Sequence, residues 1–171
     1  MSRLLAADES IALTRVQLAL LPSVSVIIGS LVPLIPIIAQ WPVLPPLGLM
    51  VFLAWRLLRP EIWAIWAGIP FGLLDDLISG NPLGTSVLLW TAIMIALDMA
   101  DNRMIWRDYW LDWLVAAALL VSYIILAMTI ATLATGGWGL EPLLPQIAVT
   151  VLLVPFVMRF CARLDRWRLS L

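Results

Sequence analysis

Six long apolar segments, separated by short stretches that carry most of the charges, dominate the sequence. The segments cover residues 18–39, 43–58, 62–79, 83–97, 110–135 and 143–160. An α-helix needs about 20 mostly apolar residues to cross the hydrocarbon core of a bilayer. The pattern therefore predicts an all-α integral membrane protein, with six transmembrane helices in a single membrane domain over residues 1–171.

The overall composition supports this prediction. Hydrophobic residues make up 63% of the chain and charged residues 12%, whereas soluble domains have about 45–50% and about 25%. The core of one soluble domain would not hide this much apolar surface from water, so the lipid bilayer is an expected partner. The formal net charge of −1 gives no reason to expect nucleic acid as a partner.

Several residue types on which catalysis and metal binding depend are missing. The chain has no histidine and no lysine, and its one cysteine is Cys161. These absences exclude Ser–His and Cys–His pairs, a Schiff-base lysine, a disulfide within the chain and most zinc sites. We therefore expect a protein that is not an enzyme, with no catalytic residues, no metal site and no cofactor.

All ten basic residues are arginines, and a six-span arrangement places them on one side of the membrane. They are Arg3, Arg15, Arg56, Arg59, Arg103, Arg107, Arg159, Arg163, Arg166 and Arg168. The positive-inside rule makes this the cytoplasmic side, so both termini are expected in the cytoplasm. The four C-terminal arginines are equally consistent with a topology signal and with binding of anionic lipid head groups.

Tryptophans gather near the ends of the apolar segments, where the indole N–H reaches water and the ring contacts acyl chains. On this ground we expect Trp55, Trp63 and Trp66 in an interfacial belt around the second connection. Trp90 lies inside the fourth segment and is interpreted as a packing residue.

The most informative local pattern lies at the end of the third segment. It reads Gly72-Leu73-Leu74-Asp75-Asp76-Leu77-Ile78-Ser79-Gly80, followed by Asn81-Pro82-Leu83-Gly84. On a helix, one face would carry Gly68, Gly72, Asp75 and Ser79, with Asp76 and Gly80 beside it. Small residues on one face allow another helix to approach closely. We therefore expect Gly72→Leu or Gly80→Leu to harm folding or assembly more than Gly48→Leu.

Other residues of this segment predict the path of the backbone. Pro70 removes one helical hydrogen bond and is expected to kink the helix. Gly80 suits a helix C-terminus, Asn81 suits an N-cap, and Pro82 suits the first position of the next helix.

Two adjacent acids, Asp75 and Asp76, are costly so close to a bilayer core. A functional interpretation has three versions: a proton or cation site, a catalytic carboxylate pair, or a polar anchor for the hairpin turn. The structural interpretation is that the carboxylates cap backbone amides of the following turn or meet water. Catalysis is disfavoured because adjacent helical residues point about 100° apart and cannot easily flank one bond.

At this hairpin the sequence resembles the rod-shape-determining protein MreD family, small all-helical inner-membrane proteins of bacteria. The recognisable stretch of the family is a glycine-rich helix with an acid, a tight turn, and Leu-Gly opening the next helix. The matching residues here are Gly72, Asp76, Gly80, Leu83 and Gly84. Asp75 is an additional acid, to which the resemblance assigns no role.

The resemblance implies a non-catalytic scaffold of the cell-elongation machinery, which builds peptidoglycan and determines rod shape. It implies a multi-pass protein of the inner membrane whose membrane partner is MreC. Through MreC or directly, further partners would be MreB, RodA and a penicillin-binding transpeptidase. Association between copies of the chain stays open.

The family is also similar in fold to the substrate-binding subunits of energy-coupling-factor vitamin transporters. The alternative function is therefore that of a small-molecule, vitamin-like binding subunit of a membrane transporter. Such a subunit should offer polar groups that converge from several helices near the outer face. Outside the hairpin, the polar residues within the spans are mainly serines and threonines such as Ser30, which are expected to bond helix backbones or make cross-helix contacts.

The scaffold interpretation makes a prediction about the two aspartates. If Asp76 holds the turn by hydrogen bonds, Asp76→Asn should retain much of the partner binding and Asp76→Leu should lose it. Asp75→Asn should matter less, since Asp75 is the additional acid.

Overall fold

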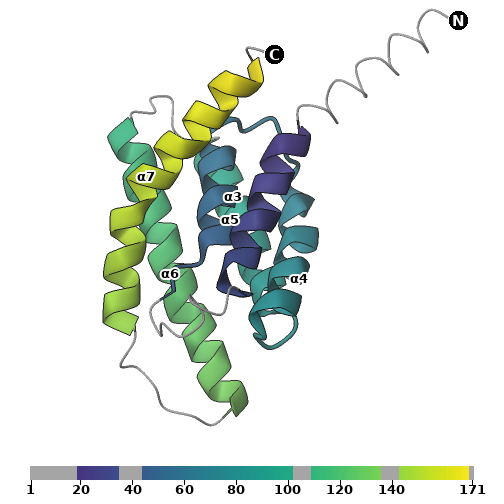
Figure 1. Ribbon diagram of the computed structural model, residues 1–171. Coiled ribbons are helices and arrows are strands. Elements are labelled where there is room, and N and C mark those ends of the chain that lie inside the picture. The colour runs from purple at the N-terminus through teal and green to yellow at the C-terminus, as the bar shows by residue number, and fades with distance from the viewer. Residues whose placement is uncertain (1–18, 35–43, 102–108, 136–142, 170–171) are drawn as a thin grey trace, which may run out of the picture.

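The computed structural model describes residues 19–34, 44–101, 109–135 and 143–169, and this part of the chain contains six helices and no strand (Figure 1). The helices are Ala19–Leu34, which ends in the 3-10 turn η1 (Val32–Leu34), α3 (Leu47–Leu58), α4 (Gly68–Ser79), α5 (Thr85–Asp101), α6 (Tyr109–Thr135) and α7 (Leu143–Leu169). The prediction of an all-helical protein is confirmed. Arg3, Arg15, Arg103 and Arg107 lie outside the described residues.

Helix α3 forms the centre of the bundle. Its residues from Gly48 to Leu57 are all buried, and it contacts both α6 and α7. The Phe52 ring lies 4.9 Å from that of Trp63 and 5.1 Å from that of Trp90, between ring centroids. Trp90 is completely buried, as expected of a packing residue. A helix that is apolar all round belongs either in the core of a bundle or in lipid, and α3 lies in the core.

Helices α6 and α7 supply the long apolar surface of the molecule. Among the described residues, these two are long and apolar enough to cross a membrane, over Trp110–Ala134 and Leu143–Arg168. Only 28% and 22% of their most apolar windows are buried, so most of the apolar side chains face outward. Leu126, Leu133, Leu152 and Phe156 are examples of exposed apolar residues. Such a surface suits lipid and does not suit water.

The third apolar segment is not one continuous α-helix. Residues Ile65–Ala67 form the 3-10 turn η2, and α4 begins at Gly68. Pro70 therefore lies in the first turn of α4, where its missing N–H removes no hydrogen bond from a longer helix. The expected kink at Pro70 is wrong, because proline marks the beginning of this helix and does not interrupt it.

Two glycines bring α4 into backbone contact with α5. A Cβ atom on Gly72 would lie 2.7 Å from the carbonyl oxygen of Ser86 and 2.7 Å from Cα of Val87. On Gly68 it would lie 2.8 Å from the backbone nitrogen of Thr91. No real Cβ atom sits so close to a backbone, so these two positions admit only glycine while the helices stay in place. The small-residue face thus packs against α5.

Two expectations about glycines are wrong. Gly80 is not a close-packing position, and Gly48 is not a position that tolerates a larger side chain. A Cβ atom on Gly80 would meet no described atom within 4 Å, and its φ of 71° shows that glycine is needed there for a left-handed backbone. Gly48 is no neutral position, since it is buried and a Cβ there would collide with Ser30 of the first described helix. Gly29 packs against the backbone of Gly48 in the same crossing. Gly48→Leu is therefore expected to be severely disruptive.

Ion pairs join three helices at the end of the bundle where α3 ends. Arg56 Nη1 lies 2.9 Å from Asp101 Oδ2. Arg59 Nη2 lies 3.0 Å from Asp165 Oδ2, and Asp165 Oδ1 lies 2.6 Å from Arg168 Nη2. Since Arg56 and Asp165 are buried, the paired groups satisfy each other where water is scarce. They connect the end of α3 to α5 and α7.

The tryptophans of this end do not all lie at the surface. Trp55 is completely buried, donates its Nε1–H to Ser25 Oγ at 2.8 Å, and lies under the Arg168 guanidinium at 5.5 Å. Its expected place in an interfacial belt is wrong, because it belongs to the core helix α3. Trp66 is 66% exposed and fits the belt.

Candidate functional site

The Asp76 carboxylate holds the beginning of α5. It is 1% exposed, and its Oδ2 accepts a hydrogen bond from the Gly84 amide at 2.8 Å. Its Oδ1 accepts one from the Ser86 amide, also at 2.8 Å. The first amides of a helix have no partner within it and carry partial positive charge, so a carboxylate satisfies them well. Asp76 is therefore an N-cap supplied by a neighbouring helix.

This cap replaces the one expected from the turn sequence. Helix α5 begins at Thr85, so Asn81 is not its N-cap and Pro82 is not its first residue. Gly80 ends α4 in the left-handed conformation, as expected. Gly84 has a φ of 98°, and this positive value, which favours glycine, lets its amide reach Asp76. Leu83 is 73% exposed, so its side chain contributes little to the bundle interior.

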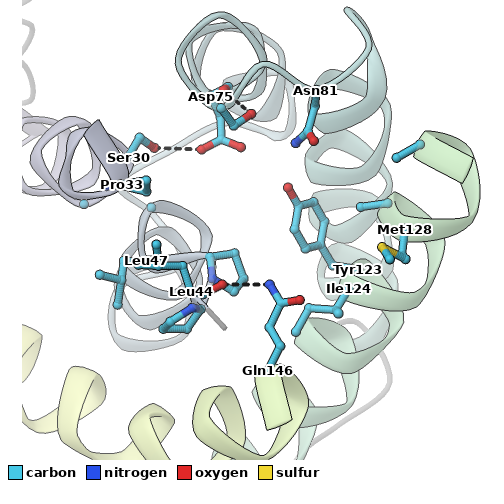
Figure 2. Close-up of a pocket in the computed structure, with 17 residues that line it drawn as sticks. Ser30, Pro33, Leu44, Leu47, Asp75, Asn81, Tyr123, Ile124, Met128 and Gln146 are labelled. Atoms are coloured by element: carbon cyan, nitrogen blue, oxygen red, sulfur yellow. Dashed lines mark hydrogen bonds between the residues drawn. The ribbon is translucent and has the colours of Figure 1, made fainter. Parts of the chain in front are cut away.

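The Asp75 carboxylate lines a cavity (Figure 2) and accepts no hydrogen bond from the described backbone amides of α5. Its Oδ1 accepts a hydrogen bond from Ser30 Oγ, and its Oδ2 accepts one from Ser86 Oγ, both at 3.0 Å. Ser86 Oγ also lies 3.2 Å from the Tyr123 hydroxyl. The chain of hydroxyls joins the first described helix, α4, α5 and α6. The two aspartates, adjacent in sequence, thus have different surroundings.

The cavity lies at the end of the bundle that carries the α4–α5 turn and has a volume of about 270 Å³. Figure 2 shows Asp75, Asn81, Tyr123 and Gln146 placed around it, from α4, the following turn, α6 and α7. Gln146 donates from Nε2 to the Leu44 carbonyl oxygen at 2.7 Å. The rest of the lining is mainly apolar and comprises Gly29, Ser30, Pro33, Leu44, Pro45, Pro46, Leu47, Gly48, Ser79, Ile124, Ala127, Met128 and Ala131.

The cavity is acidic. None of the residues that line it is basic, so Asp75 meets only hydroxyl donors within the described part of the chain. A carboxylate so placed in an apolar bundle costs free energy, and such residues mark functional positions in membrane proteins. The arrangement suits a ligand or partner that presents a hydrogen-bond donor or a positive charge.

Several members of this site do not stand out in the sequence. Ser30 and Ser86 resemble serines that bond their own helix, as Ser25 and Ser122 do, but both donate to Asp75. Tyr123 offers the clearest signal, because it is a polar aromatic residue in the middle of an apolar segment. Gln146 follows Pro145 near the start of a helix and gives no distinguishing pattern.

Carboxylates and cysteines do not cluster at the site within the described part of the chain. Among the described residues, no three acidic or cysteine side chains gather in one place. Asp75 and Asp76 face different surroundings, one at the cavity and one at the helix cap. They do not form a carboxylate pair around a common substrate position. The groups that the cavity does offer, a carboxylate, a phenol and two side-chain amides, suit hydrogen bonding and charge recognition.

An all-helical bundle with an outward apolar surface and a polar cavity at one end has the features of a helical membrane protein. Comparison with protein families gives a match over residues 14–164 to the model described as rod shape-determining protein MreD. This match covers most of the 171 residues. The chain therefore belongs to the MreD family, a bacterial membrane protein family that takes part in rod-shape determination.

Comparison of the chain with curated proteins and with solved structures gives no significant match. Proteins of the MreD family are components of the machinery that determines cell shape, and the family is not a known enzyme family.

Proposed function

We propose that the protein is a non-catalytic scaffold of the cell-elongation machinery and that it binds MreC in the bacterial inner membrane. The observation that carries the proposal is the acidic cavity at one end of a bundle that belongs to the MreD family. Asp75 lacks a basic neighbour among the lining residues, and a donor or cation from MreC would supply one. MreB, RodA and a penicillin-binding transpeptidase are then joined to this protein through MreC or directly.

The proposal includes an orientation. Six spans would place both termini in the cytoplasm and the cavity at the outer face. The start of the first described helix and the end of α7 lie at the same end of the bundle (Figure 1), which supports an even number of crossings. The described arginines lie at this end or near it, and the positive-inside rule makes it cytoplasmic.

Cysteine labelling tests the orientation. A single cysteine introduced at Asn81 or Gly137 should react with a membrane-impermeant maleimide added to intact spheroplasts. A cysteine at Arg103 or Ser170 should react only after the membrane is opened. Cys161 is buried and serves as the background in the unaltered chain. External labelling at Arg103 would contradict the six-span arrangement.

The cavity also favours a second candidate, a small-molecule binding subunit. Polar groups from several helices do converge near the proposed outer face, as such a subunit requires. The volume of about 270 Å³ is slightly below the roughly 300–1,000 Å³ of pockets that enclose a drug-sized molecule. A cavity of this size suits one or two side chains of a partner better than a vitamin, and this comparison favours the scaffold.

Purification from native membranes separates the two candidates. The tagged protein, extracted in a mild detergent, should bring MreC with it, and the same preparation should release no vitamin-like compound on denaturation. The matched variant Ala127→Trp, which fills the cavity, should bring down much less MreC. Recovery of a retained small molecule without MreC would overturn the scaffold proposal and support the transporter subunit.

A further inference from the structure

A second hollow lies at the opposite end of the bundle from Asp75, between the end of α3, the start of α6 and the C-terminal half of α7. Its volume is about 370 Å³. The lining combines apolar residues with three arginines of α7, Arg159, Arg163 and Arg166. We name it the arginine groove. It is separate from the cavity on which the scaffold proposal depends.

The three arginines of the groove form no ion pair within the part of the chain that the structure describes. Arg159, Arg163 and Arg166 are exposed. Their spacing of four and three residues places them on one face of α7. The other described arginines behave differently, since Arg56 pairs with Asp101, and Arg59 and Arg168 pair with Asp165. Among the described arginines, the groove therefore holds the three whose charges are not paired with a described acid.

The apolar part of the groove lies beside these charges. Leu57 and Met158 are buried, and Leu58 and Ala162 complete the lining. Asp112 is the one acid among the lining residues, so three positive charges face one negative charge. A ligand that fits must carry a negative head group next to a hydrocarbon chain.

We propose that the arginine groove binds an anionic glycerophospholipid of the cytoplasmic leaflet, with its phosphate against the arginines and an acyl chain along Leu57, Leu58 and Met158. Charge complementarity carries the assignment, because guanidinium groups bind phosphate oxygens in bidentate fashion and basic residues near a membrane attract anionic lipids. The placement in this leaflet rests on the orientation proposed above. The lipid would hold α3 against α7 without taking part in MreC binding.

The test uses the full chain purified in a neutral detergent and titrated with dioleoyl-phosphatidylglycerol, with bound lipid counted by native mass spectrometry. One molecule should bind in a saturable manner, and dioleoyl-phosphatidylcholine, with identical acyl chains, should bind much more weakly. Each basic residue near a membrane surface contributes roughly fivefold in affinity, so the triple variant Arg159→Gln/Arg163→Gln/Arg166→Gln should bind on the order of a hundredfold more weakly.

Two controls make the assignment specific. The variant Arg3→Gln/Arg15→Gln/Arg103→Gln removes the same charge from the same proposed side and should bind the lipid about as well as the unaltered chain. Ala162→Trp keeps every charge but fills the groove and should also lose the lipid. Thermal unfolding of each variant checks its fold, and Arg163→Gln alone should give a smaller loss if the triple variant does not fold.

Three results would overturn the proposal. These are equal binding of the two lipids, an equal loss in the charge-matched control, and saturable binding of a polyprenyl phosphate in place of the phosphatidylglycerol. Equal binding of the two lipids would show that the groove does not distinguish head groups by their charge. An equal loss in the charge-matched control would show that binding depends on the overall charge of the protein. The third would assign the groove to a different lipid.

Discussion

Replacing Asp76 with leucine should prevent the protein from folding stably. The substitution would leave the buried Ser86 amide and the part-buried Gly84 amide without an acceptor, where each now donates to the carboxylate at 2.8 Å. An unsatisfied buried group costs about 1–3 kcal/mol, so the Ser86 amide alone accounts for a loss of this size, and the part-buried Gly84 amide adds to it. The midpoint of thermal unfolding in detergent and the yield of folded protein measure it. Unfolding of Asp76→Leu at the temperature of the unaltered chain would refute the capping role.

The structure changes what to expect of Asp76→Asn. The two amides bond different oxygens of the carboxylate, and asparagine has only one acceptor oxygen. We expect Asp76→Asn to be clearly less stable than the unaltered chain, though more stable than Asp76→Leu. Asp75→Asn is the matched control, because it makes the same chemical change at the adjacent residue without touching the cap. It should leave the unfolding midpoint nearly unchanged.

Gly72→Leu should be the most damaging change in the contact between α4 and α5. A Cβ at this position would lie 2.7 Å from backbone atoms of Ser86 and Val87, which cannot move without shifting α5. Overpacking typically costs about 1–3 kcal/mol, and a clash with backbone belongs at the upper end. The loss should appear as a lower unfolding midpoint and poor recovery of folded protein.

Gly80→Ala provides the comparison for Gly72→Leu. It has nothing to collide with, so its cost is limited to the positive φ of 71°, about 1 kcal/mol. Equal unfolding midpoints for the two variants would show that close helix packing at Gly72 does not matter. Gly48→Leu cannot serve as a variant with a small expected cost, because a side chain at Gly48 would collide with Ser30.

The sequence predicted an all-helical protein with six helices, because apolar segments and the charges between them mark the helices, but not their bounds: α4 begins at Gly68 and α7 continues to Leu169. It also predicted the role of a small-residue face at Gly68 and Gly72, which follows from helical periodicity alone. The N-cap of α5 was not predictable in the same way. Asn81 and Pro82 are good local signals, yet Asp76, a buried acid from the preceding helix, takes the cap. Local preference is weaker than a charged acceptor held by tertiary packing.

The division of roles between the two aspartates also needed the structure. Family resemblance singled out Asp76 and left Asp75 without a role, and the sequence favoured a smaller effect for Asp75. The fold turns Asp76 toward the α5 amides and Asp75 toward the cavity. Ser30, Ser86 and Tyr123 join Asp75 from three other helices, and contacts between residues so far apart in sequence leave no local pattern.

The location of Trp55 illustrates the same limit. A tryptophan near a segment end suits an interface, but α3 is surrounded by other helices, so its end is buried as well. Sequence position gives depth along a helix and does not reveal which helix lies at the centre of a bundle.

Binding of MreC at the cavity is the central proposal for this protein, and one titration tests it directly. Purified MreC would be titrated into nanodiscs that hold the unaltered chain, Asp75→Asn, Ala127→Trp, or the matched control Ala118→Trp on the exposed face of α6. We predict saturable binding to the unaltered chain and to Ala118→Trp. Binding should be at least about tenfold weaker, or about 1.4 kcal/mol, for Asp75→Asn and Ala127→Trp. Equal affinity in all four, or no binding of MreC to the unaltered chain, would contradict the account.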